Sequence, residues 1–468
     1  MASIPLPFAS YQLDSLPASC SRLVNCYIEA LPPGAKTPAR LVRAPGIAQL
    51  ALGATSGVGG MIATKRKLFV YCRAGVLQEY TAHGLLGTGY SAAVGSGWPD
   101  LTTNADNVVV VVPGGLVGTQ ASYVKHTAPT SSGYITDADY SSRGASHVEF
   151  LDNYLLFLEP NTGRFFGADL GSASSFDALN YATAESHPDD LVGMIEDHGQ
   201  LFLLGEESCE LWLNSGIQGF PFERLANGRV QMGCAAGRSA AKVDQTVMCL
   251  ASDKTVRALQ GQTPVRVSHH GIEQLIDGDV SDSRAYSFSF QGHEQYVLHL
   301  PNRTVVYDAA TQAWHERQTY GQLGWLPSFH TQAFGVTWVA KPGETDIGYF
   351  DKDTYTEFGQ TQVMSWTYQP VYAENRMASH NRLEVGVETG VGDNTTTDPK
   401  IMLEVSDDGG NTFTHFSTQS LGAKGKRETR VMWHGLGMSN NRVYRMSVSD
   451  PVKVAVTDTI LDARGARL

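Results

Sequence analysis

Gln200–Trp212 reads QLFLLGEESCELW, and this pattern of an apolar run, a polar turn and a second apolar run decides the fold. Comparable units recur at Lys67–Tyr80, Asn107–Gly118, Tyr154–Phe166, Thr246–Leu259, Gln295–Asp308 and Val336–Phe350. The positions that we take as equivalent are Leu68, Val108, Leu155, Leu201, Val247, Val297 and Thr337. They are 40, 47, 46, 46, 50 and 40 residues apart, a spacing that is typical of β-propeller blades.

The repeat predicts a closed ring of sheets. A four-stranded sheet of about 40–50 residues cannot bury both of its faces alone, whereas a ring of such sheets covers the faces mutually and leaves few edges. Several units also contain the Gly or Asn residues that tight hairpin turns require, such as Ala74-Gly75, Gly114-Gly115 and Asn302-Arg303. Two β-sandwiches would show similar turn spacing and form the alternative.

The regions on either side of the repeat differ from it. Residues 1–56 are punctuated by Pro32-Pro33-Gly34 and Ala44-Pro45-Gly46, and they predict an extended arm or small platform segment that needs a partner to pack on. Residues 57–360 form the predicted propeller. The blade rhythm then stops, and shorter alternating runs predict a C-terminal β-sandwich over residues 361–468. The expected fold class is therefore all-β.

The charge balance restricts the function. The 468 residues include 35 Lys and Arg against 47 Asp and Glu, a formal net charge of -12, so sequence-specific DNA binding is not expected. The longest apolar run, Val108–Val112, is far shorter than the roughly 18 residues of a membrane span, and no signal-peptide pattern is visible. The six cysteines show no metal-ligand spacing and predict buried thiols.

One turn carries a motif of known geometry. Ser406, Asp408, Gly410, Thr412 and Phe413 have the spacing of an Asp-box, in which the Asp and Thr side chains bond the backbone of their own hairpin. Asp-boxes occur in sialidase propellers, but glycoside hydrolysis needs paired carboxylates or a tyrosine nucleophile with an arginine cluster. This single box lies outside the predicted propeller, so we expect a structural role.

The sequence predicts no catalytic, metal or cofactor site. The loop at Asp277 begins like a calcium loop, but Asp282 and Phe288 stand where the turn glycine and the bidentate glutamate belong. His269 and His270 are adjacent, and adjacent strand residues point to opposite faces, so they cannot easily share one metal. Nucleophile-elbow, P-loop, zincin and dinucleotide-binding motifs are absent from the sequence. The chain is therefore not expected to be an enzyme.

Short motifs in a fixed order are similar to those of a known family. They are Val24–Glu29, Leu41–Ile47, Ala184–Asp189, Ser208–Leu213, Met232–Ala236, Gly292–Tyr296, Val306–Asp308, Trp314–Arg317, Arg430–Trp433 and Arg442–Val452. With them the chain resembles, over nearly its whole length, the packaged-DNA stabilisation or tail-nozzle (tail-hub) proteins of short-tailed bacteriophages. The motif residues that we single out are Asn25, Arg43, Pro45, Gly46, Gly233, Cys234, Trp314, His315, Glu316 and Arg317. We expect them to act in packing, with Trp314 as a buried anchor and Arg317 as the partner of a nearby carboxylate.

The resemblance implies a structural virion protein of the phage tail. Members form a hexameric ring below the portal and its head-to-tail adaptor, extend and close the DNA channel, retain packaged DNA, and anchor tail spikes or fibres and a needle or plug. Assembly in the bacterial host cytoplasm is implied, with no cofactor, no membrane insertion and no sequence-specific DNA binding. The net charge of -12 fits, because acidic walls repel phosphates within a Debye length of roughly 8 Å.

A carbohydrate-binding or glycan-hydrolysing β-propeller is the alternative function. It rests on the Asp-box and on four tryptophans that could stack on sugar rings: Trp212, Trp314, Trp325 and Trp338. Tryptophans at blade-strand positions are more often part of the core. A glycan array and a reducing-sugar assay would separate the two hypotheses.

Overall fold

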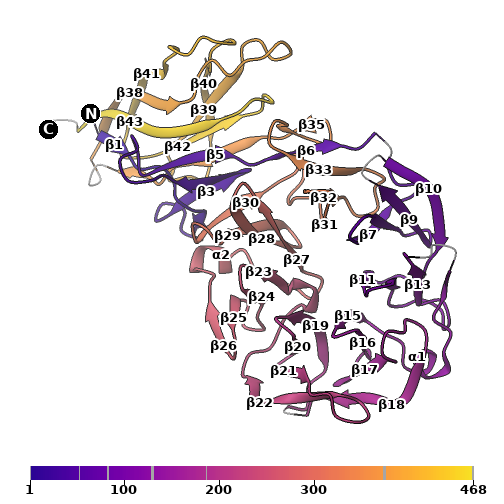
Figure 1. Cartoon of the computed structure of the whole chain (residues 1–468). Coiled ribbons are helices and arrows are strands. Elements are labelled where there is room, and N and C mark those ends of the chain that lie inside the picture. The colour runs from indigo at the N-terminus through magenta and orange to yellow at the C-terminus, as the bar shows by residue number, and fades with distance from the viewer. Residues whose placement is uncertain are drawn as a thin grey trace.

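The computed structural model of the chain describes residues 2–51, 53–81, 84–127, 131–185, 187–372 and 376–465. Figure 1 shows a ring of sheets with a second, smaller body attached to its rim. Strands dominate both parts, and the helical segments in the described residues are short: α1 (Ala138–Arg143), η1 (Gly237–Ser239) and α2 (His270–Glu273). The all-β fold class predicted from the sequence is confirmed.

The ring is a propeller of seven blades within the described residues, each built on four antiparallel strands; five blades are separate sheets, and the sheets of blades 6 and 7 continue into further strands. Blade 1 contains β7 (Val58–Ala63), β8 (Leu68–Cys72), β9 (Val76–Thr81) and β10 (Gly84–Ser91). Blade 2 contains β11 (Asp100–Thr103), β12 (Asn107–Val111), β13 (Ala121–Lys125) and β14 (Ser132–Tyr134). Blade 3 contains β15 (His147–Leu151), β16 (Tyr154–Leu158), β17 (Arg164–Ala168) and β18 (Phe176–Thr183).

The next three blades follow the same order. Blade 4 contains β19 (Leu191–Asp197), β20 (Gln200–Gly205), β21 (Cys209–Asn214) and β22 (Phe222–Val230). Blade 5 contains β23 (Ala241–Val243), β24 (Thr246–Leu250), β25 (Val256–Gln260) and β26 (Thr263–Arg266). Blade 6 contains β27 (Arg284–Phe290), β28 (His293–Leu300), β29 (Arg303–Asp308) and β30 (Ala313–Arg317). The first strand of each blade lies near the centre of the ring in Figure 1.

Blade 7 is built from both ends of the propeller sequence. Its inner strands are β31 (Phe329–Ala333), β32 (Val336–Ala340) and β33 (Ile347–Asp351), and its fourth strand is β6 (Gly46–Gln49). β6 runs antiparallel to β33, with Gly46 opposite Asp351 and Gln49 opposite Gly348. The short strands β34 (Thr356–Glu357) and β35 (Gln360–Thr361) extend this sheet.

Seven hydrophobic clusters of the described residues fill the contacts between neighbouring blades, one for each contact. The cluster between the first and last blades packs Val70 and Tyr80 against Trp338 and Ile347, so the ring is closed. Every position that we took as equivalent in the repeat lies on the second strand of a blade. The period thus reflects the stacking of identical units around an axis.

The smaller body is a β-sandwich. One sheet has the order β4 (Cys26–Ala30), β5 (Ala39–Arg43), β43 (Ala455–Gly465), β38 (Ala378–Val387) and β41 (Val431–Ser439), with β1 (Ala2–Ile4) paired to β43. The other has the order β3 (Cys20–Val24), β36 (Met364–Thr367), β42 (Asn441–Val448), β39 (Lys400–Ser406) and β40 (Thr414–Ser420). β2 (Tyr11–Gln12) pairs with β3, and β37 (Val371–Tyr372) pairs with β42. Trp366, Trp433 and Met446 form the centre of the core between the sheets.

The N-terminal segment is not the separate arm that the sequence suggested. β1, β3, β4 and β5 complete the sandwich and β6 completes the propeller, so the segment packs within its own chain. Local sequence could not reveal this, because β1, β3, β5 and β6 each pair with a strand hundreds of residues away. The division into residues 1–56, 57–360 and 361–468 stays a prediction.

The structure predicts that Gly46→Ala will weaken ring closure. A Cβ at Gly46 would lie 2.4 Å from the Thr354 carbonyl oxygen and 2.6 Å from that of Thr356. Both are backbone atoms, so β6 would have to shift, and we expect a loss of about 1–3 kcal/mol in the free energy of unfolding. Denaturant unfolding measures it. Gly465→Ala is the control, since nothing lies within 4 Å of its added Cβ, and equal stability of the two variants would contradict the argument.

Candidate functional site

Most of the motif residues meet where the rim of blade 6 joins the sandwich. At this junction β3 lies beside β30 in parallel, with Val24 opposite Glu316, and the blade 6 sheet continues through β3 into the sandwich. Figure 1 shows the two strands side by side at the base of the sandwich. The motif residues gathered here are Asn25, Arg43, Pro45, Gly46, His315, Glu316 and Arg317.

Asn25 connects three segments at the junction. It follows β3 with a left-handed φ of 54°, a conformation that Asn tolerates better than most residues. Its Nδ2 donates to the carbonyl oxygens of Gln318 at 2.9 Å and Val363 at 2.8 Å, and its Oδ1 accepts from the Gln318 amide at 3.1 Å. Asn25 is 1% exposed, so these bonds take the place of bonds to water. They hold the end of blade 6 to the linker, the segment at Gln362 and Val363 that leads into β36.

Glu316 is the centre of an ion-pair group at the same place. Arg22 on β3 binds it through Nε and Nη2, both at 2.9 Å, and Arg303 on β29 approaches at 3.2 Å. The carboxylate is almost fully buried whereas both guanidinium groups are about one-third exposed. Removing a cation from a buried carboxylate is costly, because the remaining charge stays buried without full compensation. The Arg22–Glu316 ion pair therefore links the sandwich strand β3 to the propeller strand β30.

Arg43 is buried among carbonyl groups of the sandwich and linker. Its guanidinium donates to the Val452 carbonyl oxygen at 3.0 Å and also to those of Asp450 and Gln362. Burial lowers the pKa of Arg43 to about 10. Gln362 in turn donates to the Pro45 carbonyl oxygen at 3.2 Å, so Arg43 and Pro45 fix the path of the chain from the sandwich into β6.

Arg317 lies near the carboxylate of Glu357, whose charge acts on it, but its hydrogen bond and its ring contact are made with other groups. It donates to the Pro45 carbonyl oxygen at 3.1 Å, and its Cζ lies 4.2 Å from the centre of the Trp325 ring. The nearby Glu357 instead accepts from Thr319 Oγ1 and Trp325 Nε1. Burial lowers the pKa of Arg317 to about 10, and the charge of Glu357 opposes this shift. The face of the Trp325 ring further stabilises the cation.

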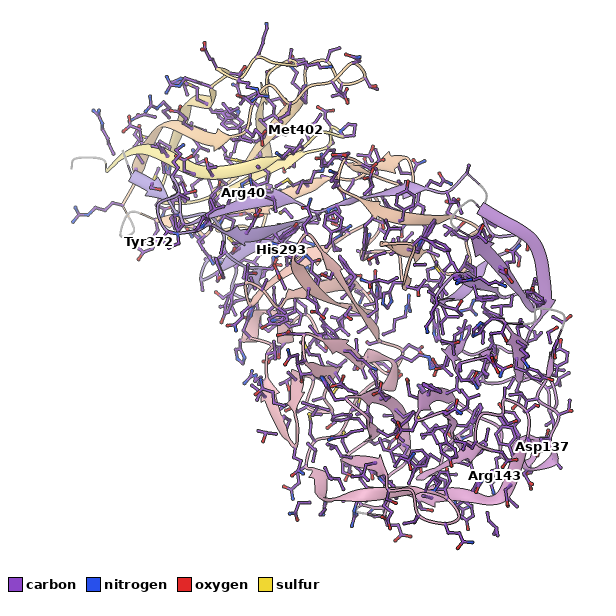
Figure 2. All side chains as sticks on the ribbon, in the orientation of Figure 1. Arg40, Asp137, Arg143, His293, Tyr372 and Met402 are labelled. Atoms are coloured by element: carbon purple, nitrogen blue, oxygen red, sulfur yellow. The ribbon has the colours of Figure 1, made fainter. Side chains whose placement is uncertain are left out.

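A histidine pair adds a titratable group beside the junction. His293, labelled in Figure 2, donates from Nδ1 to Asp308 Oδ2 at 2.6 Å. Its ring lies 4.8 Å from that of Tyr27 on β4. His315 lies on the other side of Tyr27 with a ring separation of 5.8 Å, and burial lowers the pKa of His315 to about 3. The pKa values of the two imidazoles at the junction are therefore shifted in opposite directions: the hydrogen bond to Asp308 raises that of His293, and burial lowers that of His315.

The remaining motif residues lie away from the junction. Trp314 is 1% exposed, belongs to the cluster between blades 5 and 6, and donates from Nε1 to the Val267 carbonyl oxygen at 3.2 Å. Gly233 and Cys234 lie between blades 4 and 5, where a Cβ at Gly233 would come within 1.8 Å of the Glu206 carbonyl oxygen. All six cysteines are buried and free.

The Asp-box turn joins β39 to β40 in the sandwich. Asp408 accepts from Ser406 Oγ at 2.6 Å, from the Asn411 amide at 2.9 Å and from Thr412 Oγ1 at 2.6 Å. These bonds hold the pKa of Asp408 well below its usual range. The ring of Phe413 lies 3.9 Å from the Arg445 Cζ. The motif is therefore occupied by its own hairpin and leaves no carboxylate free for hydrolysis.

The tryptophans of the glycan-binding alternative are all buried. The most exposed is Trp338 at 8%, and Trp212 follows at 7%. All four belong to clusters between blades, so none presents a ring face to a sugar. In the described part of the chain, no group of three or more His, Cys, Asp or Glu side chains is arranged to hold a metal ion, and no helix is long and apolar enough to cross a bilayer.

Family models match both parts of the chain. The model for the β-propeller of bacteriophage P22 Gp10 matches residues 23–355, and the model for the β-sandwich of the same protein matches residues 364–464. The chain belongs to the bacteriophage P22 Gp10 family. It is a bacteriophage structural protein in which a β-propeller precedes a β-sandwich, as the resemblance implied.

Wider comparisons add little to the Gp10 assignment. No curated protein sequence matches the chain. Among solved structures it is similar to BamB from Moraxella catarrhalis, with 13% identity and a TM-score of 0.39 over 66% of this chain and 94% of that one. It is also similar to the computationally designed Ika8 protein, with 13% identity and a TM-score of 0.40 over 71% of this chain and 100% of that one. The N-terminal domain of Nup159 matches with 9% identity and a TM-score of 0.42 over 75% of this chain and 98% of that one.

The Gp10-family motifs identified some residues of the junction and missed others. His293 lies in the Gly292–Tyr296 motif and was therefore within reach of the sequence, whereas Arg22 and Gln362 lie outside the motifs and act at the junction as directly as the motif residues do. Arg22 adjoins the first motif, and its pairing with Glu316 could have been proposed only if β3 and β30 were known to be neighbours. Nothing in the sequence indicated Gln362, because its role depends on the position of the Pro45 carbonyl group.

Asn25→Ala should destabilise this Gp10-family chain strongly. The change leaves three backbone groups at the junction without their partner and places Ala in a left-handed conformation, so we expect a loss of about 3–5 kcal/mol in the free energy of unfolding. Thermal or urea unfolding measures it. Asn25→Gly relieves the backbone strain alone and should recover only part of the loss.

The control is Asn227→Ala on the exposed strand β22, where φ is 60°. This variant measures the cost of placing Ala in a left-handed conformation where no buried hydrogen bonds are lost. We expect it to lower the free energy of unfolding by about 1 kcal/mol. Equal losses for Asn25→Ala and Asn227→Ala would show that the bonds of Asn25 contribute nothing.

The His293–Asp308 pair predicts a pH dependence of stability. The hydrogen bond to Asp308 raises the pKa of His293 above its ordinary value of 6.5, although burial opposes this. The stabilisation is therefore fully present below pH 6.5 and is lost as the pH rises through the raised pKa. The stability difference between the native chain and His293→Gln should shrink from about pH 6 to about pH 9 in urea unfolding. His434→Gln, at an exposed position, is the control, and a constant difference for His293→Gln would contradict the assignment.

Proposed function

We propose that this Gp10-family protein is the tail nozzle of a short-tailed phage, a ring of six copies below the portal and adaptor. In this proposal the ring extends and closes the DNA channel, retains the packaged DNA, and anchors tail spikes or fibres and a needle or plug. The observation that carries the proposal is the match of both P22 Gp10 domains, in order, over nearly the whole chain. Its place of action is the virion, after assembly in the host cytoplasm.

The joint between the propeller and the sandwich has the rigidity expected of a nozzle subunit that resists the pressure of confined DNA. The sheet of blade 6 continues into the sandwich through β3, and the buried groups of Asn25 and Glu316 form bonds across the same joint. Interfaces that combine a continuous sheet with buried hydrogen bonds resist relative motion of their parts better than small polar ones. We therefore expect propeller and sandwich to act as one rigid unit in the ring.

The DNA channel in this proposal runs along the axis of the ring of copies and not through the propeller. Trp98 lies at the centre of the propeller, with Arg73 and Arg284 against its ring, so the tunnel has no room for a duplex. The net charge of -12 supports passage without adhesion, because a surface that neutralises no phosphates gains no counterion-release affinity.

The glycan-binding alternative is not favoured by any observation on this chain. Its four tryptophans are in the core and its Asp-box is satisfied by its own turn. Contacts with spikes, fibres or a plug are expected on surfaces outside the ring contact, and the Gp10 assignment is their basis.

The nozzle proposal predicts the behaviour of particles that lack this protein. Packaging acts through the portal above, so such heads should fill with DNA and then lose it, since nothing closes the channel. Nuclease sensitivity of the DNA and electron microscopy of purified particles measure this, and adding the purified protein back should restore retention. Full and stable heads in its absence would refute the nozzle assignment.

A binding measurement on the isolated protein provides the control. Duplex DNA should not bind detectably at an ionic strength of about 0.15 M, and binding should not rise steeply as salt is lowered. Tight, strongly salt-dependent binding would show that the protein grips DNA directly, and DNA retention would then need a different explanation.

A further inference from the structure

The charge of the chain is divided unequally between its two domains. Residues 46–361, which form the propeller, contain 19 Lys and Arg against 33 Asp and Glu, a net charge of -14. The rest of the chain, which contains the sandwich, has 16 against 14, a net charge of +2. Two copies of such a chain therefore repel each other least when the sandwich of one meets the propeller of the other.

One end of the sandwich has exposed apolar and basic side chains on a single sheet face. Met438 on β41 and Arg464 on β43 lie on either side of Ser379 on β38, each opposite it in the strand register. Met377 precedes Ser379 by two residues, so it points to the same face. Met377 and Met438 are 45% and 51% exposed. Arg376 and Arg464 are exposed and have no ion-pair partner in the described part of the chain.

Tyr372 extends this face at the edge of the other sheet. It pairs with Asn441, which follows the turn after Met438, and it is 72% exposed. Figure 2 shows Tyr372 on the side of the sandwich that faces away from the ring. Tyrosine, methionine and arginine are the residues that protein interfaces favour. We call this surface the sandwich end; it consists of Tyr372, Arg376, Met377, Met438 and Arg464.

The outer edge of blade 3 has exposed apolar side chains of its own. β18 is the outermost strand of this blade, and its register with β17 shifts between Phe166 and Ala168, so residues 177–180 bulge out of the sheet. Leu179 in this bulge is 77% exposed, and Leu170 in the turn before β18 is 62% exposed. Two exposed leucines on adjoining segments are unusual for a surface that only water covers.

Three aspartates surround the two leucines. Asp177 accepts from the Leu179 amide at 2.9 Å, and Asp169 accepts from Ser175 Oγ at 2.6 Å. Asp152 is exposed in the turn between β15 and β16, which is bonded to the turn at Leu170. None of the three carboxylates has an ion-pair partner among the residues that the structure describes. We call these leucines and aspartates the blade 3 edge.

The cations nearest to the blade 3 edge do not cancel its charge. Arg143 and Arg164 lie 5.2 and 5.5 Å from the centre of the Tyr181 ring, farther along β18. Asp137 and Asp139 at the start of α1 offset these two arginines. The whole edge therefore has five carboxylates against two guanidinium groups. Figure 2 shows Asp137 and Arg143 on the outer side of the ring.

The two surfaces lie at opposite ends of the chain. Figure 1 shows the sandwich with both chain termini at one end and α1 with β18 at the other. One surface is apolar and basic, and the other is apolar and acidic. Two different complementary surfaces on one chain form a heterologous contact, which leaves each added copy with a free surface until the ring closes.

We infer that the sandwich end of one copy docks on the blade 3 edge of the next copy. Arg376 and Arg464 then face the aspartates, while the tyrosine and the two methionines pack against Leu170 and Leu179. This inference rests on the proposed ring of six copies and names the surfaces that join them. Electrostatic attraction selects the head-to-tail orientation, and burial of the apolar side chains stabilises it.

Two charge-reversed variants of the full chain test the contact. The sandwich variant is Arg376→Glu with Arg464→Glu, and the blade variant is Asp152→Lys with Asp177→Lys. The association of copies is measured by analytical ultracentrifugation over a range of concentrations. Each variant alone should raise the dissociation constant between copies at least about tenfold, because like charges then face each other. The control, Lys424→Glu with Lys426→Glu in an exposed turn elsewhere in the sandwich, should associate as the native chain does.

An equimolar mixture of the sandwich variant and the blade variant should associate again. In alternating copies, every contact joins either two native surfaces or two reversed surfaces, and both combinations attract. A variant that fails only because it is misfolded would not be rescued in this way. Native association of either variant alone, or no recovery in the mixture, would overturn the inference.

A matched pair of leucine variants tests the apolar part of the contact. Leu179→Ser should weaken association about tenfold, since it removes an apolar side chain that the contact buries. Leu116→Ser is the control, because Leu116 is 81% exposed in a turn of blade 2, and it should have no effect. Equal association of the two variants would contradict the docking surface.

The outcomes separate this inference from the nozzle proposal. A native chain that stays monomeric at every concentration would overturn the contact between copies, whereas the retention of DNA in particles tests the nozzle itself. Association of the native chain that survives both charge reversals would refute these two surfaces and leave the ring in place.

Discussion

The pairing of β6 with β33 is the constraint on which the other parts of the structure depend. Seven blades bury their faces only if the first and last blades also meet, and the last blade takes its outer strand from residues 46–49. A strand from the opposite end of the sequence ties the ring together, so unfolding of blade 7 must also release the N-terminal segment. Closure by hydrogen bonds makes the ring cooperative and leaves few strand edges.

The same segment determines how the sandwich is attached. Before it reaches β6, the chain passes through β3, β4 and β5, which belong to the sandwich sheets. Asn25 marks the turn between β3 and β4, and Arg43 with Pro45 marks the step from the sandwich into the ring. Asn25 bonds to Gln318 beyond blade 6, and Arg317 of blade 6 donates to the Pro45 carbonyl oxygen, so buried hydrogen bonds cross the joint and restrict rotation of the two domains. In the proposed nozzle, this arrangement would let each copy hold its shape against confined DNA.

The motif residues divide into two physical classes. Gly46 and Gly233 are required because neighbouring backbone leaves no space for a Cβ. Asn25, Arg43, Glu316 and Arg317 instead satisfy buried polar groups of distant segments. Arg317 donates to a carbonyl oxygen and lies against an aromatic face, and the charge of the nearby Glu357 also stabilises its cation, so a buried arginine can be stabilised by a carboxylate without a direct ion pair. Sequence reasoning favoured the ion pair because only charge is visible in a sequence.

The sequence by itself determined the all-β class, the repeat of the blades and the family, because strand alternation, turn residues and the order of motifs are local properties. It also determined the Asp-box, whose bonds stay within one hairpin. Only the tertiary structure decided that the first residues belong to both domains, that Arg22 meets Glu316, and that Trp98 lies on the axis beside Arg73 and Arg284. Each of these contacts depends on which distant strands become neighbours. Those neighbours are determined only when all the blades are packed together and the ring is closed.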